Sequence, residues 1–147
     1  MPYEFKAIRR VEFSETDMVG IVHFSNFFKY MEVAEHAFFR ELGYSVVMDQ
    51  FEPAVGWPRV NAQCDYRSPL RFEDEVEIHL LVSEKKSKAL TYQFRFRKLG
   101  ANPPVEVARG SLTVVCVVRQ PDGRMSATHI PAEFAAKIEV APPELLI

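Results

Sequence analysis

The chain has 147 residues, a length at which one domain can bury about 70% of its unfolded-chain surface without disulfides. Its 48% hydrophobic and 26% charged residues exclude a disordered or collagen-like chain, and a net charge of -2 provides no general attraction to nucleic acid. No run of about 18 apolar residues and no N-terminal secretory segment is present, so we expect no membrane insertion and a cytoplasmic protein.

Hydrophobic alternation predicts a first strand over 5–13, after which the apolar pattern changes to a helical period. A long amphipathic helix is predicted over 24–42, because its apolar side chains fall within about 140° of a helical wheel. Gly43 follows as a natural helix stop. The segment 44–58 has neither period, and we expect a loop beside a pocket.

Four further segments repeat apolar residues at every second position, which is typical of half-buried strands. These strands are predicted over 60–66, 76–82, 90–96 and 105–119. In the last of them the apolar phase switches, which predicts a β-bulge near Gly110. A turn over 121–124 and a short helix over 131–138, with Pro131 at its first position, complete the chain.

This order of elements predicts an α+β domain, with a five-stranded antiparallel sheet wrapped around one long helix. No internal repeat or linker divides the chain, so we expect residues 1–147 to form a single domain. An open sheet of this size has two free edges, and edge-to-edge pairing into a dimer is the expected way to cover one of them.

The candidate chemistry lies at Asp17, a carboxylate shortly before the predicted helix start. Unbonded backbone N–H groups at a helix start can polarise a carbonyl or hold a developing oxyanion. A carboxylate beside them can act as a nucleophile or as a general base on water, which suits acyl transfer from a thioester. An Asp at this position also fits a cap or turn residue, so the spacing alone leaves both interpretations open.

The stretch from Asp17 to Glu32 resembles the 4-hydroxybenzoyl-CoA thioesterase family of hot-dog-fold enzymes, which includes the Tol-Pal-associated acyl-CoA thioesterases. The resemblance covers most of the chain, about residues 5–119. The matching positions are Asp17, Gly20, Ile21, Val22, His23, Phe24, Asn26, Glu32, Tyr66, Pro69, Asp74, Glu75 and Val76.

The resemblance implies the hot-dog fold and hydrolysis of an acyl-CoA thioester to a carboxylic acid and free CoA, with no metal or other cofactor. It implies that Asp17 is the nucleophile or general base and that the backbone amide of Phe24 donates to the thioester oxygen. It further implies an active site at a homodimer interface, often within a homotetramer.

CoA carries several phosphates, and a chain of net charge -2 must meet them with a local basic cluster. The resemblance aligns Lys86, Ser87 and Lys88 with a basic turn that contacts these phosphates in the aromatic acyl-CoA branch. A solvated hairpin turn explains the same residues equally well. Arg67 and Arg71 are weaker candidates, since exposed arginines ordinarily serve solubility or ion pairs at the rim.

Three other side chains are candidates for supporting catalysis. His23 could relay a proton near neutral pH. Glu35 falls inside the apolar arc of the helix, where an unpaired carboxylate is costly, and some other hot-dog thioesterases use a helix acid as the base. The simpler interpretation is that Glu32 orients the Asp17 loop and that Glu35 faces a partner subunit.

The remaining histidines and the cysteines do not indicate a metal site. His36, His79 and His129 show no ligand spacing with one another or with Cys64 and Cys116, and we expect the two cysteines to be reduced thiols. The GxSxG and GxxxxGK[ST] motifs of serine hydrolases and nucleotide triphosphatases are absent from the sequence.

Two alternatives to a thioesterase are a hot-dog hydratase or dehydratase and a non-catalytic acyl-CoA-binding module. Asp17 favours hydrolysis, because binding alone does not need a carboxylate beside a helix start. The aromatic residues do not select an acyl group. We expect acyl selectivity to reside in the 44–58 loop, with Phe51, Val55 and Trp57.

Overall fold

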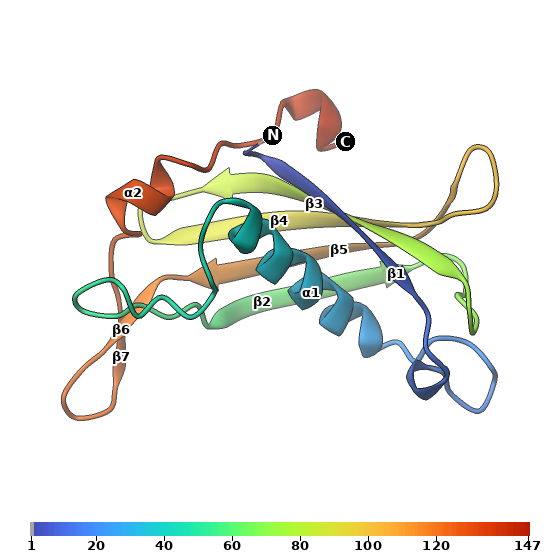
Figure 1. Cartoon of the computed structure of the whole chain (residues 1–147), viewed down its shortest axis with the longest axis horizontal. Coiled ribbons are helices and arrows are strands. Elements are labelled where there is room, and N and C mark those ends of the chain that lie inside the picture. Colours follow the sequence, from blue (N-terminus) through green and yellow to red (C-terminus); the bar gives the residue numbers. More distant parts are fainter. Residues whose placement is uncertain (1) are drawn as a thin grey trace.

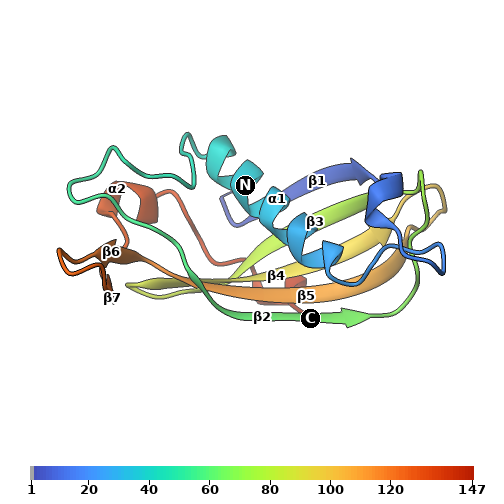
Figure 2. The same cartoon turned by 90° about the horizontal axis from the view of Figure 1, so that it is seen from below.

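The computed structural model describes residues 2–147, and it places one long helix against a single antiparallel sheet (Figure 1). Figure 2 shows that the sheet curves around this helix, α1 (Asn26–Glu41). The sheet order is β1-β3-β4-β5-β2. Its strands are β1 (Glu4–Arg10), β2 (Arg59–Tyr66), β3 (Glu75–Lys85), β4 (Ala89–Lys98) and β5 (Val105–Val115). The predicted α+β architecture is confirmed.

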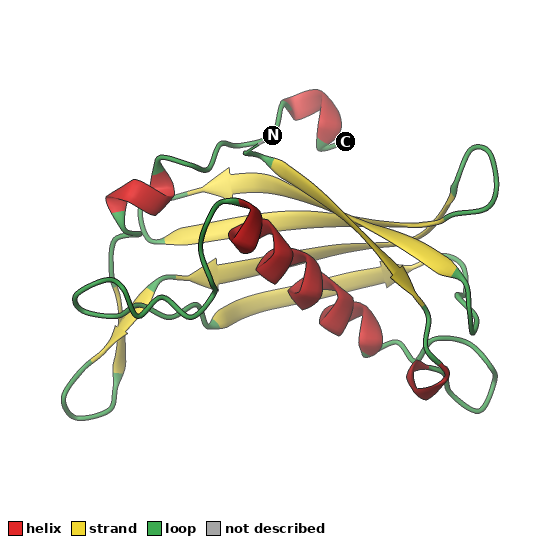
Figure 3. Cartoon of the chain, in the orientation of Figure 1, coloured by secondary structure: helices red, strands yellow, loops and turns green. Residues whose placement is uncertain are grey.

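Shorter elements join and extend this frame (Figure 3). A 3-10 turn, η1 (Phe13–Glu15), replaces the predicted end of the first strand, because the Glu12 and Glu15 side chains cap each other's backbone. The predicted strand over 105–119 divides at Cys116, whose N–H donates to Lys88 O at 2.8 Å. The remaining elements are β6 (Val117–Arg119), β7 (Met125–Ala127), α2 (Ala132–Ala135) and η2 (Pro143–Leu145).

Two details at the end of the chain differ from the sequence prediction. The turn over 121–124 connects β6 to β7 in a small hairpin, and the strand β7 was not predicted. Its three residues are too short for an alternating pattern to be recognisable. The short helix begins one residue after Pro131, which is its N-cap.

The core lies between the apolar face of α1 and the concave face of the sheet. Strand β4 alternates buried and half-buried side chains along its length, as the period-two pattern predicted. Each large side chain that is removed from water contributes about 1.5–3 kcal/mol. The largest fully buried side chains of α1 and β4 are Tyr30, Met31, Phe38, Phe39, Tyr92, Phe94 and Phe96.

The predicted β-bulge lies at Val107, three residues before Gly110. The pairing of β4 with β5 passes from Phe96–Ala108 to Arg97–Glu106, which leaves Val107 as the extra residue. The carbonyl of Val107 accepts hydrogen bonds from the N–H groups of residues 67 and 68, at 2.8 and 3.1 Å. The bulge therefore holds the segment that follows β2.

Gly110 serves a different purpose, because the helix crosses the sheet at this position. A Cβ atom on Gly110 would overlap the Met31 Cε atom and would lie 3.3 Å from the Gln63 carbonyl oxygen. The absence of a side chain at 110 therefore sets how closely α1 approaches β5.

Gly110→Ala is expected to lower the free energy of unfolding by about 1–3 kcal/mol, because the buried Met31 has to move. Gly56→Ala is the matched control, since its added Cβ would meet only Val117, at 3.8 Å. Urea unfolding followed by circular dichroism measures both changes. Equal stability of the two variants would contradict the close approach at Gly110.

Candidate active site

Residues 16–22 form a narrow loop whose two ends pair with each other. Thr16 and Val22 form an antiparallel bridge. The Asp17 N–H donates to Ile21 O at 2.8 Å, and the Gly20 N–H donates to Asp17 O at 3.0 Å. Gly20 has a φ of 88°, a left-handed conformation that favours glycine. The loop thus fixes the backbone of Asp17 from both sides.

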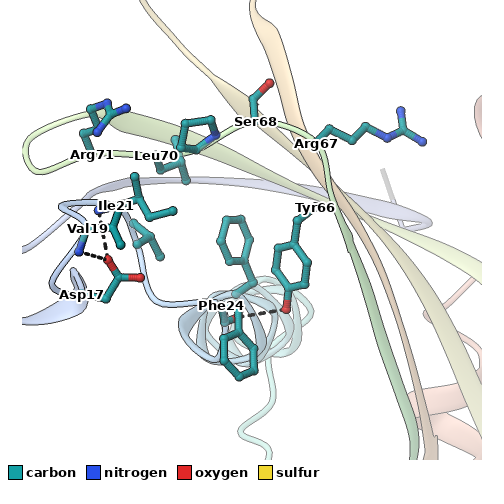
Figure 4. A pocket seen from close by; sticks show the side chains of 12 residues that line it. Asp17, Val19, Ile21, Phe24, Tyr66, Arg67, Ser68, Leu70 and Arg71 are labelled. Carbon is teal, nitrogen blue, oxygen red and sulfur yellow. Dashed lines mark hydrogen bonds between the residues drawn. The ribbon is translucent and has the colours of Figure 1, made fainter.

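The Asp17 carboxylate uses one oxygen to close this loop. Its Oδ1 atom accepts hydrogen bonds from the N–H groups of Val19 and Ile21, at 2.9 and 3.4 Å. Figure 4 shows the second oxygen pointing away from these amides, toward the side on which Phe24 lies. Asp17 is therefore a turn residue that still presents one carboxylate oxygen for chemistry.

Phe24 lies in the turn that leads into α1. Its carbonyl oxygen accepts a hydrogen bond from the Tyr66 hydroxyl at 3.0 Å, and burial raises the pKa of Tyr66 to about 12, so this hydroxyl stays a donor. The Phe24 N–H has no hydrogen-bond acceptor within residues 2–147. A fixed peptide with an uncommitted N–H at a helix start is suited to hold an oxyanion.

His23 orders this turn rather than entering the pocket. Its Nδ1 atom accepts a hydrogen bond from the Ser25 N–H at 3.3 Å and lies 2.8 Å from the Ser25 hydroxyl. Because a backbone N–H can only donate, the ring proton of the neutral imidazole is on Nε2. The ring stacks on Phe24 with centroids 4.6 Å apart.

Asp17 and Phe24 line the same pocket, which has a volume of about 570 Å³ (Figure 4). This volume is within the usual range for small-molecule sites. Arg67 at its wall is paired with Glu106 at 2.8 Å. The other lining residues are Val19, Ile21, Val22, Phe27, Tyr66, Ser68, Pro69, Leu70 and Arg71.

The structure does not bring Glu32 and Glu35 into this pocket. Glu32 is exposed and lies 3.5 Å from Arg59, so it does not orient the Asp17 loop of its own chain. Glu35 is fully buried and accepts a hydrogen bond from Arg59 Nη2 at 2.5 Å, so it does not face outward to a partner. The irregularity of β2 at Val60 accompanies this inward position of Arg59.

The surroundings of Glu35 are unusual for a carboxylate. Burial raises its pKa, although Arg59 acts in the opposite direction. The Tyr92 hydroxyl lies beside this carboxylate and also acts against the rise in its pKa, and no other described residue pairs with that hydroxyl or with the Glu35 Oε2 atom. Glu35 is therefore a desolvated acid inside the core, and the geometry gives it no contact with a ligand in the Asp17 pocket.

Lys86, Ser87 and Lys88 lie in the turn between β3 and β4, at the far end of the sheet from the segment between β1 and α1 that contains Asp17 (Figure 1). Strand β3 has 11 residues, which separates its two ends by about 30 Å at about 3.3 Å per residue. Lys86 pairs with Glu84 at 2.9 Å. This turn is too far away to serve the pocket of its own chain.

The 44–58 loop lies near the C-terminal end of α1, at the opposite end of the helix from the segment between β1 and α1 (Figure 1). Trp57 is buried against Phe39 and Phe134, with ring centroids 5.6 and 5.8 Å apart. Phe51 and Val55 line a separate pocket of about 390 Å³. The expected loop beside a pocket is present, but the three residues do not line the pocket that contains Asp17.

Sequence reasoning missed Glu15, which connects the Asp17 loop to the helix. Its carboxylate accepts a hydrogen bond from the Tyr30 hydroxyl at 2.9 Å, and its carbonyl accepts one from Asn26 Nδ2 at 2.8 Å. The available signal was the spacing of Asn26 and Tyr30, which places two polar groups four residues apart on the buried helix face.

Two further findings concern residues 2–147 as a whole. They contain no group of three or more His, Cys, Asp or Glu side chains placed to hold a metal ion. None of their helices has the length and apolar character that crossing a membrane requires.

Comparisons with known proteins fit this geometry. A family model described as the thioesterase-like superfamily matches residues 11–138. A protein of Aquifex aeolicus (strain VF5), named "Putative esterase", is 40% identical over 96 residues, which are 64% of this chain and 71% of the relative.

Two solved structures have the same fold. A gentisyl-coenzyme A thioesterase superposes with a TM-score of 0.77 and 29% identity, over 92% of this chain and 100% of that one. The 4-hydroxybenzoyl CoA thioesterase of Pseudomonas sp. strain CBS-3 superposes with a TM-score of 0.79 and 18% identity, over 92% and 99% of the two chains.

The buried position of Glu35 predicts that the free energy of unfolding depends on pH, independently of activity. The pKa of Glu35 is higher in the folded state than in the unfolded chain. Between these two pKa values the folded protein therefore binds more protons than the unfolded chain. As the pH rises through this range, the free energy of unfolding falls. Glu35→Gln cannot ionise and is expected to lack this loss. Denaturant unfolding at a series of pH values from 4 to 8 measures the difference, and identical slopes for both proteins would contradict the prediction.

Proposed function

Since this chain belongs to the thioesterase-like superfamily, we propose that it is an acyl-CoA thioesterase that hydrolyses a CoA thioester to a carboxylic acid and free CoA. The observation that carries the proposal is the meeting of Asp17 and the Phe24 peptide in one pocket. Hydrolysis of a thioester needs an activated oxygen nucleophile and a donor for the oxyanion, and these two groups supply them.

The proposed reaction starts when the thioester oxygen accepts a hydrogen bond from the Phe24 N–H. This hydrogen bond polarises the carbonyl. The unshared oxygen of Asp17 then attacks the carbonyl carbon or takes a proton from an attacking water molecule. Collapse of the tetrahedral intermediate breaks the carbon–sulfur bond and releases CoA thiolate. When water is the nucleophile, the proton that Asp17 has taken passes to the thiolate. When Asp17 attacks directly, water hydrolyses the resulting mixed anhydride, which restores the carboxylate and supplies the proton for the thiolate.

We also propose that a second copy of the chain completes the site, as a homodimer or as a homotetramer of two such dimers. The free edge of β2 ends at Tyr66, beside the pocket, and its residues 60–63 are exposed. Met18, Val19 and Phe24 expose apolar side chains around the same place, and Phe24 is 61% exposed. Antiparallel pairing of two β2 edges would cover this surface.

Such a dimer would give Lys86, Ser87 and Lys88 a function across the interface. A two-fold axis reverses the sheet, so the β3–β4 turn of the second copy comes to the end at which Asp17 lies. The phosphates of CoA would then bind the turn of the second copy, while the thioester reaches the pocket of the first.

One solved structure and the cysteines of this chain indicate the substrate to test first and the location. The gentisyl-coenzyme A thioesterase of the same fold makes an aromatic acyl-CoA the first substrate to test. A cytoplasmic location agrees with the two free thiols of Cys64 and Cys116, because oxidising compartments favour paired cysteines.

Asp17→Asn is expected to lower kcat by at least about 100-fold, because the amide keeps the shape of the side chain but removes the nucleophile or base. Thiol release from a panel of aromatic and aliphatic acyl-CoAs measures this, with Asp49→Asn as the control in an exposed loop. Binding without thiol release by the wild type would indicate an acyl-CoA-binding module. Full activity of Asp17→Asn would place the catalytic carboxylate elsewhere.

A mixed dimer tests the turn across the interface. One chain carries Asp17→Asn, the other carries Lys86→Ala and Lys88→Ala, and two affinity tags isolate the mixed species. If the turn serves the other subunit, one of the two sites has an intact Asp17 and intact lysines, and it hydrolyses substrate with the wild-type KM. A raised KM in the mixed dimer would instead show that the turn serves its own chain.

A further inference from the structure

We propose that Glu15 is a positioning residue of the active site, which holds Asp17 and the Phe24 amide in register without touching the substrate. This inference rests on the proposed thioesterase function. Glu15 lies two residues before Asp17 and does not line the pocket. Its effect on the reaction must therefore pass through the two groups that do.

The main chain of Glu15 ties the loop to the start of α1. Its carbonyl oxygen accepts two hydrogen bonds, from the His23 N–H at 2.9 Å and from Asn26 Nδ2 at 2.8 Å. His23 directly precedes Phe24, and Asn26 is the buried first residue of the helix. One carbonyl group thus fixes both sides of the Phe24 peptide.

The side chain of Glu15 anchors the same residue from the opposite direction. Its Oε1 atom accepts hydrogen bonds from the Tyr30 hydroxyl at 2.9 Å and from the Glu12 N–H at 2.8 Å. Its Oε2 atom lies 3.5 Å from Arg9 Nη2. Glu15 therefore connects β1, the 3-10 turn and the second turn of α1 at a single carboxylate.

The Tyr30 hydroxyl, which donates to this carboxylate, keeps its proton. Tyr30 is 1% exposed, and its burial, together with the hydrogen bond to Glu15, raises the pKa of its hydroxyl. The hydroxyl consequently stays protonated across the working range of an enzyme. The guanidinium of Arg9 also lies over the Tyr30 ring, 5.7 Å from its centroid, and completes the enclosure of the pair.

The geometry of a nucleophile and an oxyanion donor must be held to within about 0.5 Å, and a displacement of about 1 Å can cost about 100-fold in rate. Releasing Glu15 frees the loop and the helix start to move relative to each other. The expected consequence is a loss in kcat, while KM stays near its wild-type value because the pocket walls are unchanged.

The test compares Glu15→Ala, Glu15→Gln and Glu77→Ala by thiol release and thermal unfolding. Glu15→Ala is expected to lower kcat by about 10- to 100-fold with KM within about 3-fold of wild type. Glu15→Gln keeps an acceptor for Tyr30 and for the Glu12 N–H, so its kcat should recover to within about 3-fold of wild type.

Glu77→Ala is the matched control for a purely structural effect. The side chains of Glu15 and Glu77 are 15% and 19% exposed, and each faces an arginine, but Glu77 lies on β3 outside the pocket. We expect Glu77→Ala to lower Tm without changing kcat. If Glu15→Ala lowers Tm and leaves kcat unchanged, or if Glu77→Ala reduces kcat equally, the positioning role is overturned.

If Glu15→Ala does not fold, Tyr30→Phe tests the same inference. This substitution removes one hydrogen bond to the Glu15 carboxylate and keeps the buried ring. A kcat several-fold below wild type is expected, and an unchanged kcat would overturn the inference. Failure of the wild type to hydrolyse any thioester would overturn the proposed function instead, which separates the two outcomes.

Discussion

The contact between α1 and the concave face of the sheet is the constraint on which the other features depend. Met31 lies over Gly110, where a side chain on the strand would collide with it, so the helix can approach β5 closely. Phe38 and Phe39 are fully buried farther along the same helix. Because the helix is held along its length, its first turn has a defined position, and the Phe24 peptide lies directly before that turn.

The segment that leads into this helix leaves the Phe24 N–H without an acceptor among residues 2–147. Ser25, its N-cap residue, makes no side-chain capping bond, whereas Glu12 and Glu15 cap the neighbouring 3-10 turn reciprocally. A missing cap costs about 1 kcal/mol of helix stability. The N–H groups of residues 25 to 28 are bonded within the chain, so the Phe24 N–H is the one in this segment that is left for a substrate oxygen.

Three acids on or near α1 differ in use because they differ in the groups that surround them. Asp17 presents a carboxylate oxygen to the pocket. Glu15 is partly buried and accepts hydrogen bonds from the donors around the loop. Glu35 is sealed beneath the helix with Arg59, where burial raises its pKa. The same functional group thus serves the proposed catalysis, the proposed positioning and the core in three different surroundings.

The sequence by itself determined the main elements and the local motif, because strand and helix periods and the spacing from Asp17 to Phe24 are properties of short segments. Only the tertiary structure decided which side chains meet between segments. A helical wheel places Glu35 on the apolar arc but cannot show that Arg59 reaches it from β2. The distance from Lys86 to Asp17 likewise depends on the direction of β3, and the role of Glu15 depends on a tyrosine 15 residues away.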